Sequence, residues 1–166
     1  MHGPPALPSG HTHPNLFTDL DETNLVEVLV AVAEACDASS VNLRLDLSCD
    51  GPVIVPGPPP SWARALAELI ANAVAEGPAG AEVLVRLCRS DDGAVLSVAD
   101  HGAGIAPDGF APYYERPALG GIRRLLGEWG GGKIAISSGG ARPGTRIDVT
   151  IHEGSTEKPQ AARPMA

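Results

Sequence analysis

The apolar positions of the chain fall into helical and alternating patterns that predict its elements. Apolar residues recur every three or four positions in three segments, which predicts helices over 23–37, 59–76 and 118–128. Short alternating or continuous apolar runs predict strands over 41–47, 53–55, 81–89, 94–99, 133–137 and 145–151. This order favours an α+β two-layer sandwich, with a mostly antiparallel mixed sheet packed on about three helices.

Local signals suggest where the first two helices begin and which face of the second one is buried. Thr23 or Asp21 is a candidate cap for the first helix, and Ser61 for the second. The apolar stripe predicted for the second helix consists of Leu66, Ile70, Ala73 and Val74.

The chain of 166 residues has the length of one domain with a sizeable core. Residues 1–20 and 153–166 lack an apolar period, so we expect both to be flexible tails. The domain itself is predicted over 21–152. No internal repeat and no second domain is indicated.

The net charge of −8 narrows the classes of partner. Nucleic acids and anionic membranes attract basic surfaces, so neither is expected to bind. No apolar run approaches the roughly 20 residues that span a bilayer, and the N-terminus does not resemble a signal peptide. We therefore expect a cytoplasmic protein.

Two polar residues of the second predicted helix share one face. Glu68 and Asn72 are four positions apart, which places them about 40° from each other around the helix axis. An amide oxygen is a suitable ligand for Mg²⁺, and a carboxylate can orient or deprotonate a nucleophile. Taken alone, such a pair is more often a solvated helix surface.

A polar loop follows the strand predicted over 94–99. Asp100 can accept a hydrogen bond from the exocyclic amine of adenine, Gly102 and Gly104 allow close approach of the backbone to a flat ring, and Ile105 can pack on that ring. An ordinary turn has the same composition. A calcium loop is disfavoured, because the glycines supply no side-chain oxygens.

Together, the two motifs resemble the GHKL ATPases, which include gyrase, an ATP-driven chaperone, mismatch-repair ATPases and histidine kinases. Residues 68–73 (ELIANA) resemble the N box of that superfamily, and residues 98–105 (VADHGAGI) resemble its G1 box. The order of elements is most similar to the ATP-binding domain of histidine kinases, over about residues 22–152.

This resemblance implies a site for ATP and Mg²⁺. It implies that Asn72 binds the metal and that Glu68 is the catalytic polar group near the γ-phosphate. It further implies that Asp100 recognises adenine, in a pocket shaped by Gly102 and Gly104.

The segment expected to form the nucleotide lid, residues 108–126 (DGFAPYYERPALGGIRRLL), departs from the family pattern. Histidine kinases carry a G-x-G-L-G box there, of which only Gly120 and Gly121 remain. The basic residue often found after the N-box Asn is replaced by Ala75 and Glu76. Candidates to compensate are Arg116, Arg123 and Arg124. Thr145, at the start of the closing strand, completes the set of residues expected around the nucleotide.

The resemblance implies phosphoryl transfer to a His or Ser of a partner signalling protein, as in two-component signalling. No helical hairpin with a phosphoacceptor His is predicted before the domain, so we expect a fragment of a longer kinase, a partner that acts in trans, or a descendant that binds without catalysis. One alternative is a regulatory binding module of the same fold without efficient turnover, which binds its partner through the region of Tyr113 and Tyr114. A structural domain without nucleotide is the third alternative.

Overall fold

The computed structural model describes residues 22–38, 41–139 and 143–152, so the tails predicted at 1–20 and 153–166 lie outside the described residues. Its elements are β1 (Glu22–Asn24), α1 (Leu25–Ala38), β2 (Leu43–Ser48), β3 (Ile54–Pro56), α2 (Pro59–Glu76), β4 (Val83–Ser90), β5 (Gly93–Ala99), a 3-10 turn (Pro107–Gly109), α3 (Phe110–Tyr114), α4 (Pro117–Glu128), β6 (Gly132–Ser138) and β7 (Thr145–Ile151).

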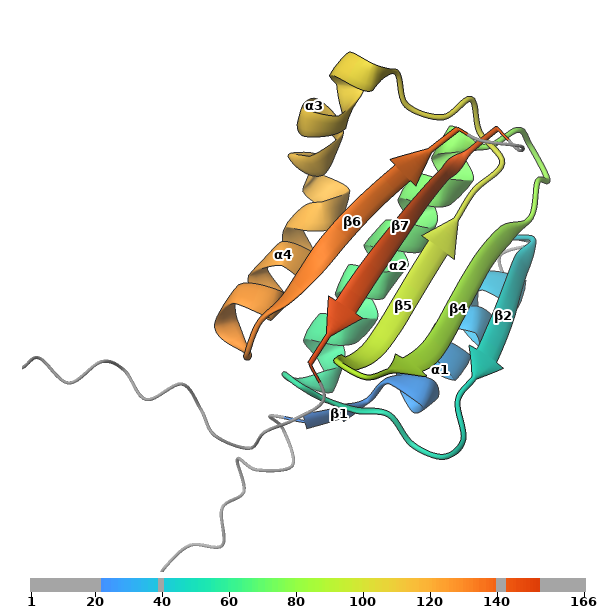
Figure 1. The fold of residues 1–166 in the computed structure, drawn as a ribbon. Coiled ribbons are helices and arrows are strands. Elements are labelled where there is room, and N and C mark those ends of the chain that lie inside the picture. The colour runs from blue at the N-terminus through green and yellow to red at the C-terminus, as the bar shows by residue number, and fades with distance from the viewer. Residues whose placement is uncertain (1–21, 39–40, 140–142, 153–166) are drawn as a thin grey trace, which may run out of the picture.

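The fold is the predicted α+β two-layer sandwich. Five strands form one sheet in the order β2-β4-β5-β7-β6, and β1 and β3 form a separate antiparallel ribbon. Within the large sheet β2 and β4 are parallel, and the other three pairings are antiparallel. Helices α1 and α2 cover one side of this sheet, and α4 lies beside its β6 edge (Figure 1). No described helix has the length and apolar character needed to cross a membrane.

The start of α1 differs from the sequence prediction. Thr23 belongs to β1, and its hydroxyl donates a hydrogen bond to the Gly57 carbonyl at 2.7 Å. Asn24 caps the helix instead, because its Oδ1 accepts a hydrogen bond from the backbone N–H of Val26 at 3.2 Å. The other candidate, Asp21, lies outside the described residues.

The start of α2 also differs from the prediction. The helix begins at Pro59 after Pro58, and no side chain caps it, so the prediction of Ser61 as a cap was wrong. Proline suits this position because it lacks one of the N–H groups that the first helical turn leaves unpaired.

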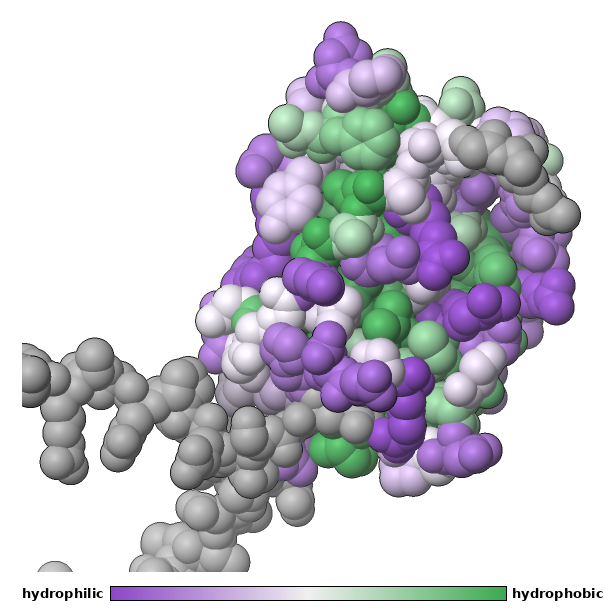
Figure 2. Space-filling model, in the orientation of Figure 1, coloured by the Kyte–Doolittle hydropathy of each residue, from purple (hydrophilic) through white to green (hydrophobic). Residues whose placement is uncertain are grey.

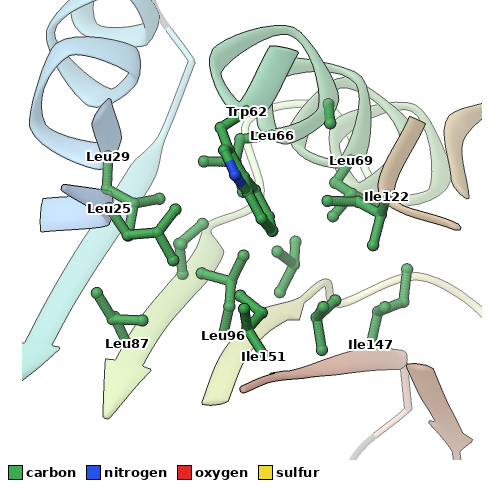
Figure 3. Packing of buried hydrophobic residues seen from close by; sticks show 14 of the residues in the cluster. Leu25, Leu29, Trp62, Leu66, Leu69, Leu87, Leu96, Ile122, Ile147 and Ile151 are labelled. Carbon is green, nitrogen blue, oxygen red and sulfur yellow. The ribbon is translucent and has the colours of Figure 1, made fainter. Parts of the chain in front are cut away.

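A single apolar core joins the helices to the inner face of the sheet. Leu66 of α2 and the strand residues Leu87 and Leu96 belong to this core, and all three are fully buried (Figure 3). Trp62 lies at the centre of this layer, where its Nε1 donates a hydrogen bond to the Pro56 carbonyl at 2.8 Å. The indole thereby fixes α2 against the turn that precedes it.

Three of the four positions predicted for the apolar stripe of α2 are confirmed. Leu66, Ile70 and Ala73 are buried, whereas Val74 is 39% exposed, so its assignment to the stripe was wrong. Leu69 is fully buried instead, because α4 covers the neighbouring side of α2. Because α4 packs on α2, the buried face of α2 includes Leu69 and does not include Val74.

The other face of the sheet is largely polar (Figure 2). Arg86 on β4 donates to Asp46 on β2 at 2.9 Å, and Arg146 donates to Asp148 within β7 at 2.8 Å. Ser97 on β5 donates a short hydrogen bond to Asp148. Polar side chains that pair along and across the strands let this face of the mixed sheet meet water.

We expect Leu66→Ala to lower the free energy of unfolding by about 2–5 kcal/mol, because it leaves a cavity in the core. Val74→Ala on the same helix should change it by less than about 1 kcal/mol, since the side chain is partly exposed and Ala favours helices. Urea denaturation followed by circular dichroism measures both. Equal losses would contradict the orientation of α2.

Candidate functional site

One side of α2 carries three polar residues spaced by four positions, namely Glu68, Asn72 and Glu76. Successive residues of this set are therefore about 6 Å apart along the helix axis. Glu76 contacts the G1-like loop and Arg116, Asn72 contacts α3, and Glu68 contacts α4.

Asp100 joins the end of β5 to the start of β7. Its Oδ1 accepts hydrogen bonds from the backbone N–H groups of Gly102 at 2.8 Å and of Thr145 at 3.1 Å. Its own N–H donates to the Thr145 carbonyl at 2.9 Å. The residue is only 8% exposed, and its Oδ2 accepts no hydrogen bond from the described residues. Oδ1 therefore holds the loop in place, while Oδ2 has no hydrogen-bond partner among the described residues.

The glycines of the loop allow close contacts within the protein. A Cβ on Gly102 would lie 2.4 Å from the Glu76 carbonyl oxygen, and one on Gly104 would lie 2.5 Å from Ser138 Oγ. Gly144 approaches the loop from the opposite side, and a Cβ there would lie 2.1 Å from the Asp100 carbonyl oxygen. The loop is thus enclosed by the end of α2 and by the residues around the β6–β7 turn.

Ser138 holds the far end of the loop, a role that the sequence did not indicate. Its hydroxyl accepts a hydrogen bond from the Ile105 N–H at 2.6 Å and donates one to the Gly144 carbonyl at 2.9 Å. The Ile105 side chain is half-buried against the core. The structure therefore brings together Asp100, Gly102, Gly104, Ile105 and Thr145, all expected around the nucleotide.

Asn72 contacts Tyr113, a residue for which the sequence suggested only a role in partner binding. Its Nδ2 donates a hydrogen bond to the Tyr113 hydroxyl at 2.8 Å. Tyr113 lies on α3 and is 3% exposed, and this burial raises the pKa of its phenol, so the hydroxyl stays protonated. The Oδ1 of Asn72 accepts no hydrogen bond from any described residue. That amide oxygen is the atom that a metal ion would bind.

Glu76, which stands where a basic residue is expected, binds a cation from the lid. It forms a short ion pair with Arg116, the residue that precedes α4. The Arg116 guanidinium also lies over the Tyr113 ring, 4.3 Å from its centroid. The positive charge near Asn72 is thus supplied by the lid segment, while α2 supplies the carboxylate.

Glu68 lies at the other end of this face and is more accessible. Its Oε1 accepts a hydrogen bond from Arg64 Nε at 3.2 Å, and its side chain is 36% exposed. It borders a groove of about 200 Å³ between α2 and α4. The groove is lined by Ser61, Arg64, Ala65, Glu68, Gly121, Arg124, Leu125 and Glu128.

Gly120 and Gly121 lie inside α4. A Cβ on Gly121 would lie 3.2 Å from Glu68 Oε2 and 3.3 Å from Ala65 Cβ, so this glycine permits the close crossing of α4 and α2. Gly120 faces the Arg123 guanidinium, 3.8 Å from the position of its Cβ. Of the two, Gly121 is brought next to a predicted site residue.

Three solved structures of similar fold come from histidine kinases. The mycobacterial sensor histidine kinase MprB matches with a TM-score of 0.69 and 24% identity, over 80% of this chain and 97% of that one. The histidine kinase domain of the E. coli osmosensor EnvZ matches with a TM-score of 0.67 and 19% identity, over 91% and 99%. The ATP-binding domain of PrrB from Mycobacterium tuberculosis matches with a TM-score of 0.65 and 22% identity, over 82% and 99%.

Identities this low establish the shared fold alone, and no curated protein matches the chain in sequence. The family is shown by a sequence model instead. Residues 57–155, more than half of the chain, match the family described as histidine kinase-, DNA gyrase B- and HSP90-like ATPases. The matched span includes α2 with Glu68 and Asn72, the Asp100 loop and the closing hairpin. The chain belongs to this ATPase family, and its fold is that of a histidine-kinase ATP-binding domain.

Proposed function

We propose that this domain binds ATP with Mg²⁺ in the cytoplasm and supports transfer of the γ-phosphoryl group to a His or Ser of a partner signalling protein. The observation that carries the proposal is the state of Asp100. Two backbone N–H groups fix Oδ1, while Oδ2 has no partner among the described residues. A carboxylate held in this way is suited to accept a hydrogen bond from the adenine amine.

The amide oxygen of Asn72 is suited to bind a metal ion that enters the site together with the nucleotide. The described residues contain no group of three His, Cys, Asp or Glu side chains that could hold a metal ion. The protein thus offers Mg²⁺ the single amide oxygen of Asn72, and the remaining ligands would be water and phosphate oxygens, which this ion accepts readily. When bound, the ion would neutralise charge on the phosphates.

Glu68 is proposed as the catalytic carboxylate. It lies one helical turn from Asn72 on the same side of α2, and its exposure leaves it accessible to an acceptor group. There it would accept the proton of the attacking nucleophile. Most of the catalysis in phosphoryl transfer comes from positioning and charge stabilisation, so this carboxylate contributes one part of the rate.

The phosphates are proposed to lie toward the start of α4. Helix N-termini attract anions, and Gly120 keeps a side chain out of the space beside the first turn of this helix, where Arg123 lies. Gly102, Gly104, Ile105 and Thr145 would complete the adenine end of the same site.

A non-catalytic regulatory module of the same fold is the alternative function. One observation favours it: both remaining lid glycines are inside a helix rather than in a loop. A wild-type protein that binds ATP but neither hydrolyses it nor phosphorylates a partner would support this alternative.

We expect Asp100→Asn to weaken ATP and ADP binding alike, by about 10-fold, because both nucleotides lose a charged acceptor for the adenine amine. Isothermal titration calorimetry measures both affinities. Asp50→Asn, at an exposed position after β2, should leave them unchanged. Unaltered binding by Asp100→Asn would contradict the adenine role.

We expect Asn72→Ala to lower the affinity for ATP only when Mg²⁺ is present. ADP affinity measured with EDTA should remain, because adenine recognition does not involve this amide. The matched control is Asn42→Ala, since this exposed amide donates a hydrogen bond to the Gly80 carbonyl at 3.2 Å and, among the described residues, to no other group. Equal loss of ATP and ADP affinity in Asn72→Ala would argue against a metal ligand.

Replacement of the proposed base by Glu68→Gln should slow release or transfer of labelled γ-phosphate by about 100-fold, while ATP affinity stays the same. Glu128→Gln, which alters a second carboxylate of the same groove, should have no such effect. A rate for Glu68→Gln equal to that of the wild type would remove Glu68 from catalysis.

A further inference from the structure

Four side chains form a continuous series of contacts between α2 and the lid segment. Asn72 donates to the Tyr113 hydroxyl at 2.8 Å, Arg116 lies over the Tyr113 ring, and Arg116 is paired with Glu76. The first and last members belong to α2, and the two in the middle belong to α3 and the start of α4. These contacts join α2 to the lid segment and are separate from the backbone hydrogen bonds that form α2.

The chemistry of the amide suggests an answer. Asn72 can offer a metal ion only its Oδ1, because Nδ2 is a donor. The side chain is half-buried, so an orientation that presents Oδ1 outward leaves Nδ2 in need of a partner inside the protein. The Tyr113 hydroxyl is that partner, and it leaves Oδ1 without a hydrogen bond from the described residues.

The position of Tyr113 is itself well fixed. Its ring belongs to the buried core and is 3% exposed. The Arg116 guanidinium covers the ring at 4.3 Å and is held in turn by Glu76. Helix α3 has only five residues, which is too few for a helix to be stable alone. These contacts therefore determine where the Tyr113 hydroxyl lies.

We propose that Tyr113 is a positioning residue that orients the Asn72 amide for Mg²⁺, and that magnesium binding is thereby coupled to docking of α3 on α2. This inference rests on the proposed function. Because coupling between two binding events is reciprocal, Mg-ATP should also stabilise the docked α3.

The test uses Tyr113→Phe in the full chain, which keeps the ring and removes only the hydroxyl. ATP affinity is measured across a Mg²⁺ titration, and ADP affinity is measured in EDTA. We expect the apparent Mg²⁺ affinity to fall by about 3- to 10-fold, as the loss of one hydrogen bond implies, with ADP affinity in EDTA unchanged. A purely structural role would weaken both nucleotides together.

Tyr114→Phe is the matched control. This neighbouring tyrosine is 37% exposed, and its ring is covered by Arg123 at 5.2 Å instead of contacting Asn72. Its Mg²⁺ dependence should equal that of the wild type. Arg116→Gln gives a second measurement, because it removes the cation over the ring but keeps the hydroxyl, and a smaller loss in the same direction is expected.

Hydrogen exchange tests the reciprocal effect without any assay of turnover. Mg-ATP should slow exchange of the amides of residues 110–114 in the wild type, and slow it less in Tyr113→Phe. Identical slowing in both proteins would overturn the coupling.

Two further results would overturn the proposal while the proposed function stands. If the wild type binds Mg-ATP and Tyr113→Phe shows the same Mg²⁺ dependence, the hydroxyl does not position Asn72. If Tyr113→Phe binds Mg-ATP more tightly, Tyr113 competes with the metal. A wild type that binds no ATP would overturn the proposed function, and the positioning role with it.

Discussion

The buried carboxylate of Asp100 is the interaction on which the rest of the site depends. A charge that is 8% exposed needs strong donors, and the N–H groups of Gly102 and Thr145 provide them. These two bonds hold the loop after β5 against the first residue of β7. The arrangement also requires Gly102 and Gly144, because any side chain there would overlap the backbone of the enclosing elements.

Helix α2 then relates this loop to the lid. Its polar residues recur every four positions, and each meets a different element: Glu68 meets α4, Asn72 meets α3, and Glu76 meets both Arg116 and the loop at Gly102. The lid segment is therefore fixed by three contacts along one helix face. This arrangement explains how a short lid with few glycines can still be placed over the polar face of α2.

Much of this could be predicted from the sequence, and the exceptions share a physical cause. Helix α2 and the central strands have strong periodicity, and the motifs that contain Glu68, Asn72 and Asp100 resemble those of the family. Helix α3 was missed because five residues that include a proline show no period. Its contact between Tyr113 and Asn72 joins residues 41 positions apart, and the support of Ile105 by Ser138 joins residues 33 apart. Pairings of this kind follow from the packed fold rather than from local pattern.

We propose that the face between the Asp100 loop and Asn72 binds nucleotide. Calorimetric titration of ATP and ADP into the wild-type protein, with and without Mg²⁺, tests this. Both nucleotides should bind, and Mg²⁺ should strengthen ATP binding more than ADP binding, because Asn72 would hold the metal near the phosphates. Absence of binding at millimolar nucleotide would contradict the proposal, and the fold would then serve as a scaffold for a protein ligand.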